Sequence, residues 1–111
     1  MRLTFVETTQ FTRTVAAAGW EEDVRLLQLE LLQNPEKGPM EVGTGGLRKV
    51  RMRLRGSGKG KSSGARVHYV YVRDRELIYL LFVYAKAEQS VLSEQQKKIL
   101  RPLIERFKSE R

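Results

Sequence analysis

The chain has 111 residues and carries 21 Lys and Arg against 13 Asp and Glu, a formal net charge of +8. With 41% hydrophobic residues it can build a core, which excludes a basic disordered tail, and its length suits a single domain over residues 1–111. The absence of cysteine and the single histidine disfavour disulfide scaffolds and metal hydrolases, so we expect no metal and no cofactor.

The N-terminal third of the chain predicts a short strand and two helices. Leu3–Val6 has strand character, and Thr9 is placed to cap a helix that ends at Gly19. A second helix is indicated by apolar residues at helical spacing, Trp20, Val24, Leu27 and Leu31. Because Asn34-Pro35 ends that pattern, the two helices are predicted to form an antiparallel hairpin.

The middle of the chain changes to the alternation of strands. Leu47–Leu54 alternates apolar and cationic residues, so Lys49, Arg51 and Arg53 are expected on one face. Arg66–Val72 is rich in β-branched and aromatic residues, Asp74-Arg75 supplies a turn, and Leu77–Tyr84 is apolar enough for a central strand. An antiparallel meander follows, bracketed by glycine-rich segments that we expect to be flexible loops.

A last helix is predicted near the C-terminus. Ser93 and Gln96 fit a capping box, and an apolar stripe follows that is interrupted by Pro102, where we expect a kink or a second segment. The predicted fold is α+β, of order β-α-α-β-β-β-α, with an antiparallel sheet packed against the helical hairpin and the C-terminal helix. The longest apolar run, Leu77–Ala85, is too short for a membrane span and the N-terminus lacks a secretory signal, so we expect a cytoplasmic protein without a membrane partner.

The positive charge is concentrated in one stretch. Residues 42–73 contain no Asp or Glu, and they hold nine cations: Arg48, Lys49, Arg51, Arg53, Arg55, Lys59, Lys61, Arg66 and Arg73. Cations at alternate strand positions project about 7 Å apart, close to the spacing of phosphates along a nucleic-acid strand. This pattern favours a surface that binds a polyanion, with a merely solvated cationic patch as the alternative.

RNA can be cleaved without an enzyme nucleophile, because its own 2′-hydroxyl attacks the adjacent phosphorus. The enzyme then supplies a proton acceptor, cations for the pentacoordinate phosphorane and a proton for the leaving 5′-oxygen. A pair of histidines is impossible here because His68 is the only one. Lysine or arginine would have to act instead, and crowding of cations lowers a lysine pKa toward a useful range.

Three fragments of the sequence occur together in a known family. They are Gly43-Thr44-Gly45-Gly46-Leu47-Arg48-Lys49-Val50-Arg51, Gly58–Tyr69 and Tyr84-Ala85-Lys86-Ala87-Glu88. In this order they resemble the RelE/HigB toxins of type II toxin–antitoxin systems, and the HigB-like branch most. The resemblance implies a ribosome-dependent mRNA endonuclease, an mRNA interferase that needs no metal, cuts message in the A site and so inhibits translation and growth. It also implies a cognate antitoxin, often of helix-turn-helix type, and the ribosome with its rRNA and mRNA as partners.

The resemblance also assigns roles to residues. Lys49 and Arg51 match strand residues that contact the message, Arg66 matches the arginine at the scissile phosphate, and Lys86 matches a basic position at the far wall of the site. These four are the candidate catalytic residues. The candidate RNA-binding residues are Arg48, Arg53, Lys59, Lys61, His68 and Tyr84. His68 shares the face of Arg66 and could contact a base, with a structural histidine as the alternative.

The sequence departs from the family at one point. Some RelE-type toxins carry a catalytic tyrosine in the C-terminal segment, whereas residues 88–93 contain none, and Tyr84 and Lys86 are the nearest substitutes. Two other functions stay open from the sequence alone. One is a toxin on the same scaffold that inhibits DNA gyrase, as the related ParE toxins do, and the other is a basic RNA-binding module without toxicity.

Overall fold

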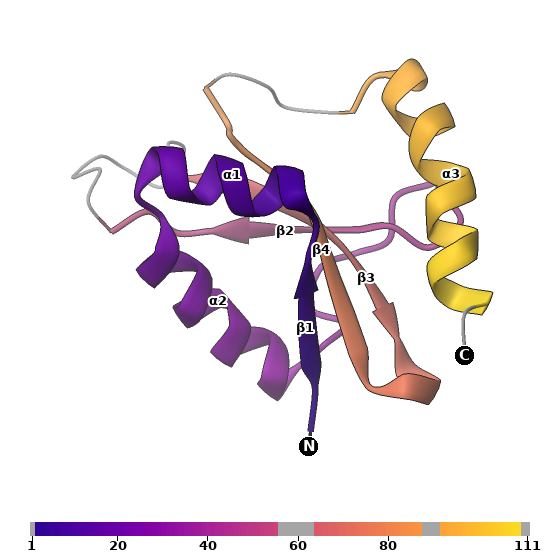
Figure 1. Cartoon of the computed structure of the whole chain (residues 1–111), viewed down its shortest axis with the longest axis horizontal. Coiled ribbons are helices and arrows are strands. Elements are labelled where there is room, and N and C mark those ends of the chain that lie inside the picture. The colour runs from indigo at the N-terminus through magenta and orange to yellow at the C-terminus, as the bar shows by residue number, and fades with distance from the viewer. Residues whose placement is uncertain (1, 56–63, 88–91, 110–111) are drawn as a thin grey trace.

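The computed structural model describes residues 2–55, 64–87 and 92–109. Its elements are β1 (Thr4–Glu7), α1 (Thr9–Ala18), α2 (Glu21–Gln33), β2 (Arg48–Met52), β3 (Ala65–Val72), a 3₁₀ turn (Arg73–Arg75), β4 (Leu77–Ala85) and α3 (Glu94–Ser109). This confirms the predicted α+β order (Figure 1). Within these described ranges, no helix is both long and apolar enough to cross a membrane.

The four strands form one mixed sheet. Their order is β1-β4-β3-β2, so the long apolar strand β4 is central, as predicted. Strands β2, β3 and β4 make the expected antiparallel meander, but β1 pairs with β4 in parallel, with Thr4 opposite Leu77. The expectation of an antiparallel sheet is therefore wrong for β1. A parallel pairing requires a long connection between the two strands, and the segment from α1 to β3 provides it.

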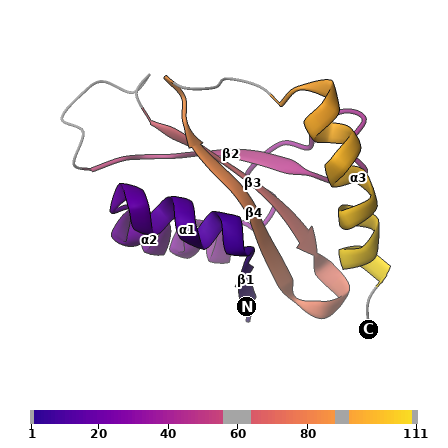
Figure 2. The ribbon, with the colours of Figure 1, turned by 45° about the horizontal axis from the view of Figure 1, so that its top comes forward.

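Helices cover the two faces of the sheet unequally. Figures 1 and 2 show the α1–α2 hairpin on one side and α3 on the other. The core under the hairpin contains Phe11, Leu27, Leu31, Val50, Met52, Val67, Tyr69, Ile78 and Leu80. The second core, under α3, contains Leu47, Val70, Val72, Tyr79, Leu81, Leu92, Leu100 and Ile104. The strands β3 and β4 contribute alternate residues to each core, as the pleat of a strand requires.

One irregularity interrupts the pairing of β3 with β4. His68 is opposite Phe82, whereas the next residue, Tyr69, is opposite Leu80, so Leu81 is an extra residue in β4. This is a β-bulge. Because of it, the neighbouring residues Leu81 and Phe82 both pack in the core under α3.

The helix ends show why the helices begin and stop where they do. Thr8, one residue before the predicted cap, accepts a hydrogen bond from the Phe11 amide at 3.1 Å, and Gly19 ends α1 with φ of 73°. At α3 the predicted capping box is confirmed: Ser93 and Gln96 bond each other's backbone amides at 2.9 and 3.1 Å. The helix continues through Pro102, so no second segment starts there.

The segment before β2 is a compact turn rather than the flexible loop that its glycines predicted. The Glu41 amide donates to the Leu47 carbonyl at 2.8 Å, and the buried Thr44 hydroxyl donates to the Glu41 carbonyl at 2.7 Å. Gly43, Gly45 and Gly46 all have positive φ, which explains their place in this turn. From α3, Arg101 and Lys108 each donate to carbonyl oxygens of the turn at 2.7 Å.

Candidate functional site

Two rows of side chains cross the sheet at the end that α3 leaves uncovered. In one row Arg51 of β2, Arg66 of β3 and Tyr84 of β4 are register partners. In the next row Lys49, His68 and Phe82 are partners in the same order. Register partners lie on one face with Cα atoms about 5 Å apart, so the strands bring together residues that are far apart in the sequence.

These rows share their face with α3. Alternation along β3 places Arg66 and His68 on the same side as Val70 and Val72, which pack in the core under α3. The face is thus divided: its apolar half lies under α3, and its cationic half lies beyond the helix. We call the cationic half, formed by Lys49, Arg51, Arg66, Tyr84 and Lys86, the basic face.

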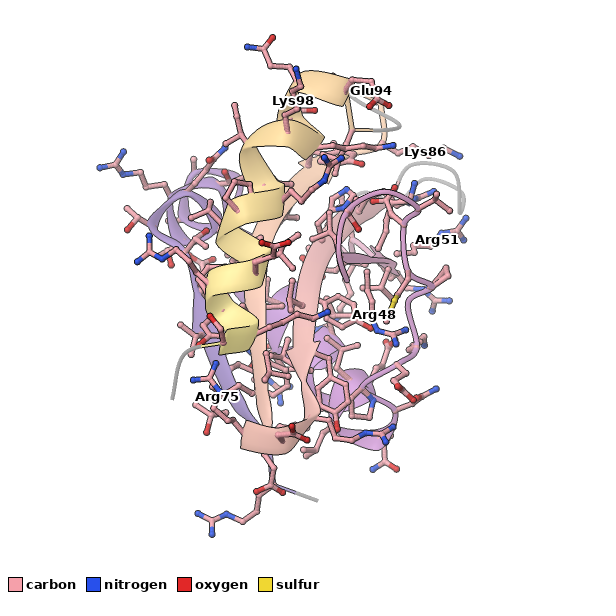
Figure 3. The ribbon with its side chains drawn as sticks, turned by 90° about the vertical axis from the view of Figure 1, so that its right-hand side faces the viewer. Arg48, Arg51, Arg75, Lys86, Glu94 and Lys98 are labelled. Atoms are coloured by element: carbon pink, nitrogen blue, oxygen red, sulfur yellow. The ribbon has the colours of Figure 1, made fainter. Side chains whose placement is uncertain are left out.

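The cations of the basic face are available to a ligand. Arg51 is exposed, and Lys49, Arg66 and Lys86 are half-buried. Among the described residues, no carboxylate forms an ion pair with any of these four. Lys86 follows the end of β4, where its amide bonds the Gly64 carbonyl at 3.0 Å, and Figure 3 labels it and Arg51 on the side of the molecule beside α3. Four cations without carboxylate partners among the described residues make this a surface of high positive potential, and the Arg66 guanidinium itself donates only to the neighbouring Ala65 carbonyl at 3.2 Å.

His68 lies beneath the basic face and is not exposed at all. Its Nδ1 is 2.9 Å from Oε1 of Glu41, and its Nε2 is 2.9 Å from the hydroxyl of Tyr84. The rings of His68 and Tyr84 are 5.4 Å apart at a tilt of 32°. Since no surface of His68 reaches solvent, the direct RNA contact expected from the sequence does not agree with this position, and the structural alternative does.

The surroundings of His68 and Tyr84 hold both side chains uncharged at pH 7. Burial, with the Lys49 ammonium as a second cause, lowers the pKa of His68 to about 4. The Glu41 carboxylate by itself favours a charged ring, but the loss of hydration is the larger effect. Burial also raises the pKa of Tyr84; the Glu41 carboxylate acts in the same direction, and Arg66 opposes both.

Four other predicted site residues lie elsewhere or fall outside the described residues. Arg48 lies on the opposite face, as its register partner Tyr69 does, and there its guanidinium donates to the Gly38 carbonyl at 2.8 Å and contacts Glu36 at 3.4 Å, so it binds the preceding segment rather than facing a ligand. Arg53 is exposed just beyond the end of β2. Lys59 and Lys61 lie outside the described residues.

Glu41 is a site residue that sequence reasoning missed. It lies in the turn before β2, and its side chain is only 16% exposed. A signal was present, since Glu41 is the last acidic residue before the acid-free stretch of residues 42–73. What the sequence could not show is that the turn folds back over β3, so that this carboxylate meets His68.

A groove of about 780 Å³ lies between α2 and β2, beside the basic face. Apolar side chains of both elements line it, including Leu26, Leu29, Val50 and Met52. Four cations also line it: Lys49, Arg51, Arg53 and Arg55. Lys49 and Arg51 of β2 therefore border both the groove and the basic face.

The fold has a counterpart among solved structures. No family model matches the sequence. The chain is similar to the E. coli toxin RelE, solved in the free state as a mutant with two arginines changed to alanine. The TM-score is 0.62 at 19% sequence identity, over 90% of this chain and 100% of that chain. The chain therefore has the RelE fold, as its motifs predicted, while membership of the HigB-like branch stays a prediction.

Proposed function

We propose that this chain is the toxin of a type II toxin–antitoxin system, and that it acts as an endoribonuclease on mRNA in the ribosomal A site. The observation that carries the proposal is the basic face, where Lys49, Arg51, Arg66 and Lys86 gather without carboxylate partners among the described residues. The RelE fold supports it, because the solved protein that shares the fold is a toxin.

The arrangement suits a message held by its backbone. Lys49 and Arg51 are two residues apart on β2, about 7 Å along the strand, which fits successive phosphates. Arg66 stands beside Arg51 in the next strand and can share a phosphate with it. Contacts of this kind do not read the base sequence, so selection of the cleavage position would come from the ribosome and the codon.

The same cations serve the chemistry. When the 2′-hydroxyl attacks phosphorus, negative charge builds on the phosphoryl oxygens, and fixed guanidinium groups stabilise that charge without reorganisation. Of the four cations, Arg66 is the one in the middle of its row, with Arg51 on one side and Tyr84 on the other, and we assign this role to it. The products would be a 2′,3′-cyclic phosphate and a free 5′-hydroxyl, formed without a metal ion.

Two partners follow from this function. The ribosome would present the message, with rRNA contributing further phosphates to the cationic surface. An antitoxin of helix-turn-helix type, encoded beside the toxin, would block the surface. The groove between α2 and β2 suits an antitoxin segment with both apolar and acidic side chains, because its lining combines apolar residues with five cations against two carboxylates, Asp23 and Glu30.

The test is cleavage of a defined message in a purified translation system. We expect new 5′ ends within translated codons by primer extension, cyclic phosphate on the 3′ ends, and no loss of activity with EDTA at a concentration that leaves the ribosomes intact. Expression in cells should arrest growth, and co-expression of the neighbouring antitoxin should restore it. Arg13→Ala, an exposed change on α1 away from the basic face, serves as a folded control with full activity.

The contrary result is growth arrest without new ends in the message. Inhibition of DNA supercoiling under those conditions would support a gyrase inhibitor on the same scaffold. Binding to RNA with neither cleavage nor growth arrest would point to an RNA-binding module.

A further inference from the structure

Three side chains from three parts of the fold form a line that ends at the basic face. Glu41 comes from the turn before β2, His68 from β3 and Tyr84 from β4. The two links are the 2.9 Å contacts of His68, Nδ1 to the carboxylate and Nε2 to the phenol. His68, in the middle of the line, is fully buried, the Glu41 side chain is 16% exposed, and Tyr84 is half-buried beside Arg66.

The line has a direction. A carboxylate next to Nδ1 favours the tautomer that carries its proton there, and this leaves Nε2 as the acceptor for the Tyr84 hydroxyl. The phenol then donates its proton inward, and its oxygen lone pairs face outward, toward the basic face. An outward lone pair can accept a proton from a substrate hydroxyl.

The contact between Glu41 and His68 is close but is not a well-aligned hydrogen bond. Oε1 of Glu41 and Nδ1 of His68 are both buried, and neither makes a well-aligned hydrogen bond within the described residues. Yet the turn holds Glu41 firmly, through its amide to Leu47 and its carbonyl to Thr44. Leaving such a pair imperfectly bonded in the interior costs stability, and costs of this kind persist at functional sites.

We propose that Glu41, His68 and Tyr84 form a proton relay in which Tyr84 is the general base of the nuclease, a role that rests on the function proposed above. The 2′-hydroxyl gives its proton to the Tyr84 oxygen while the Tyr84 proton passes to Nε2 of His68. The freed 2′-oxygen forms its bond to phosphorus, and the bond from phosphorus to the 5′-oxygen breaks. Water protonates the leaving 5′-oxygen, and the proton on His68 returns to solvent through Tyr84 after release.

The roles within the relay differ. Tyr84 touches the reacting hydroxyl and is the catalytic residue. His68 and Glu41 are positioning residues, since the imidazole orients the phenol and takes up its proton, and the carboxylate stabilises the imidazolium formed in the transition state. In this scheme Tyr84 takes the place of the C-terminal tyrosine that the sequence lacks. A phenol is protonated at neutral pH, so Tyr84 can act as a base only by passing its own proton to His68.

The experiment measures kcat and KM for message cleavage with Tyr84→Phe, Glu41→Gln, His68→Gln and the double variant of Tyr84 and Glu41. We expect kcat to fall about 100-fold or more for Tyr84→Phe and about 10- to 100-fold for Glu41→Gln and His68→Gln. KM and the affinity for a 2′-O-methyl message should stay within about twofold. The double variant should be no slower than Tyr84→Phe alone, because both changes break one relay.

Two matched controls remove the same groups elsewhere. Tyr71→Phe takes a hydroxyl from the opposite face of the sheet, and Glu105→Gln takes an exposed carboxylate from α3. Both should keep wild-type rates. His68 is buried, so its variant counts only if thermal melting shows a folded protein; Tyr84→Phe and Glu41→Gln, at more exposed positions, decide the matter in any case.

The outcomes separate the two proposals. A wild type that cleaves message while Tyr84→Phe or Glu41→Gln cleaves equally fast would overturn the relay and leave the nuclease standing. Losses that multiply in the double variant would also count against a shared relay. A wild type that cleaves no message on ribosomes would refute the proposed function and the relay with it.

Discussion

Arg51 and Arg66 stand directly opposite each other across β2 and β3, on the same face of the sheet. Two like charges in opposed positions destabilise a sheet, by a few tenths of a kcal/mol to about 1 kcal/mol. Among the described residues neither one has a carboxylate partner to offset this repulsion. An arrangement that lowers stability in this way is expected where a polyanion supplies the missing negative charge.

The first prediction concerns Arg66 itself. Arg66→Ala should lower the rate of message cleavage roughly 100- to 1,000-fold, because it removes a fixed charge from the developing phosphorane. It should leave the melting temperature unchanged or raise it, since the repulsion with Arg51 is relieved. Rate and melting temperature are measured on the same preparation, with Arg13→Ala as the control. A fall in melting temperature that parallels the loss of rate would indicate a structural role instead.

The second prediction concerns salt. If Lys49, Arg51, Arg66 and Lys86 each contact one phosphate, the affinity for a single-stranded RNA should fall with a log–log slope of about −3 against salt concentration. Lys86→Ala should make the slope shallower by about 0.7. The measurement uses a 2′-O-methyl RNA, which binds without being cut. A slope near zero would mean that phosphates are not what the basic face binds.

The third prediction concerns acid. His68 has a folded pKa of about 4 against 6.5 for a free histidine, so between these values the unfolded chain binds a proton that the folded chain does not. Stability should therefore decrease as pH falls from about 6.5 toward 4, by about 3 kcal/mol in all. The titratable or charged side chains around His68, against which its protonation is set, are Glu41, Lys49, Arg66 and Tyr84.

Denaturant unfolding at several pH values measures this decrease. His68→Gln cannot titrate, so its stability should be flatter over the same range. An equally steep decrease in His68→Gln would assign the acid sensitivity to carboxylates elsewhere in the chain.

The fourth prediction concerns Gly38, which packs against the sheet. A Cβ atom there would lie 2.6 Å from the Lys49 carbonyl oxygen and 3.1 Å from the Tyr69 ring. Gly38→Ala should destabilise the protein by about 1–3 kcal/mol, because both neighbours are held in place. Gly45→Ala is the comparison: no atom lies within 4 Å, but φ is +81°, so that variant reports backbone strain alone. Equal losses of stability in the two variants would contradict the packing argument.

Most of the fold could be predicted from local sequence patterns. This holds for the helices, for the capping box of Ser93 and Gln96 and for the meander, because each depends on residues that are close in the sequence. The parallel pairing of β1 with β4 was not readable, since nothing near Thr4 records a partner as distant as Leu77. Pro102 was expected to kink the last helix or to start a second segment, and α3 runs through it as one helix. The residue four positions earlier, Lys98, is exposed, so water can bond the carbonyl that proline leaves without a donor.

The candidate site was predictable only as far as alternation reaches. Alternation placed Lys49 and Arg51 on one face, and the pleat of β3 adds Arg66 to it. It could not reveal that Arg48 turns to Gly38 and Glu36, because that contact depends on how the preceding segment folds back. The same fold-back brings Glu41 to His68, and for that reason the carboxylate was missed and the histidine was counted among the candidate RNA-binding residues, with a structural role as the alternative.

The extra residue in β4, Leu81, determines which side chains of β4 lie on the same face as Arg66 and His68. With strict alternation from Tyr79 and Leu81, the apolar face under α3 would continue through Val83, and Tyr84 would point toward the α1–α2 hairpin. The bulge at Leu81 resets the phase, so that Phe82 and Tyr84 join His68 and Arg66. A relative of the same length whose β4 paired with β3 without this bulge could keep every cation in its sequence and still be inactive, because its tyrosine would lie on the opposite face of the sheet.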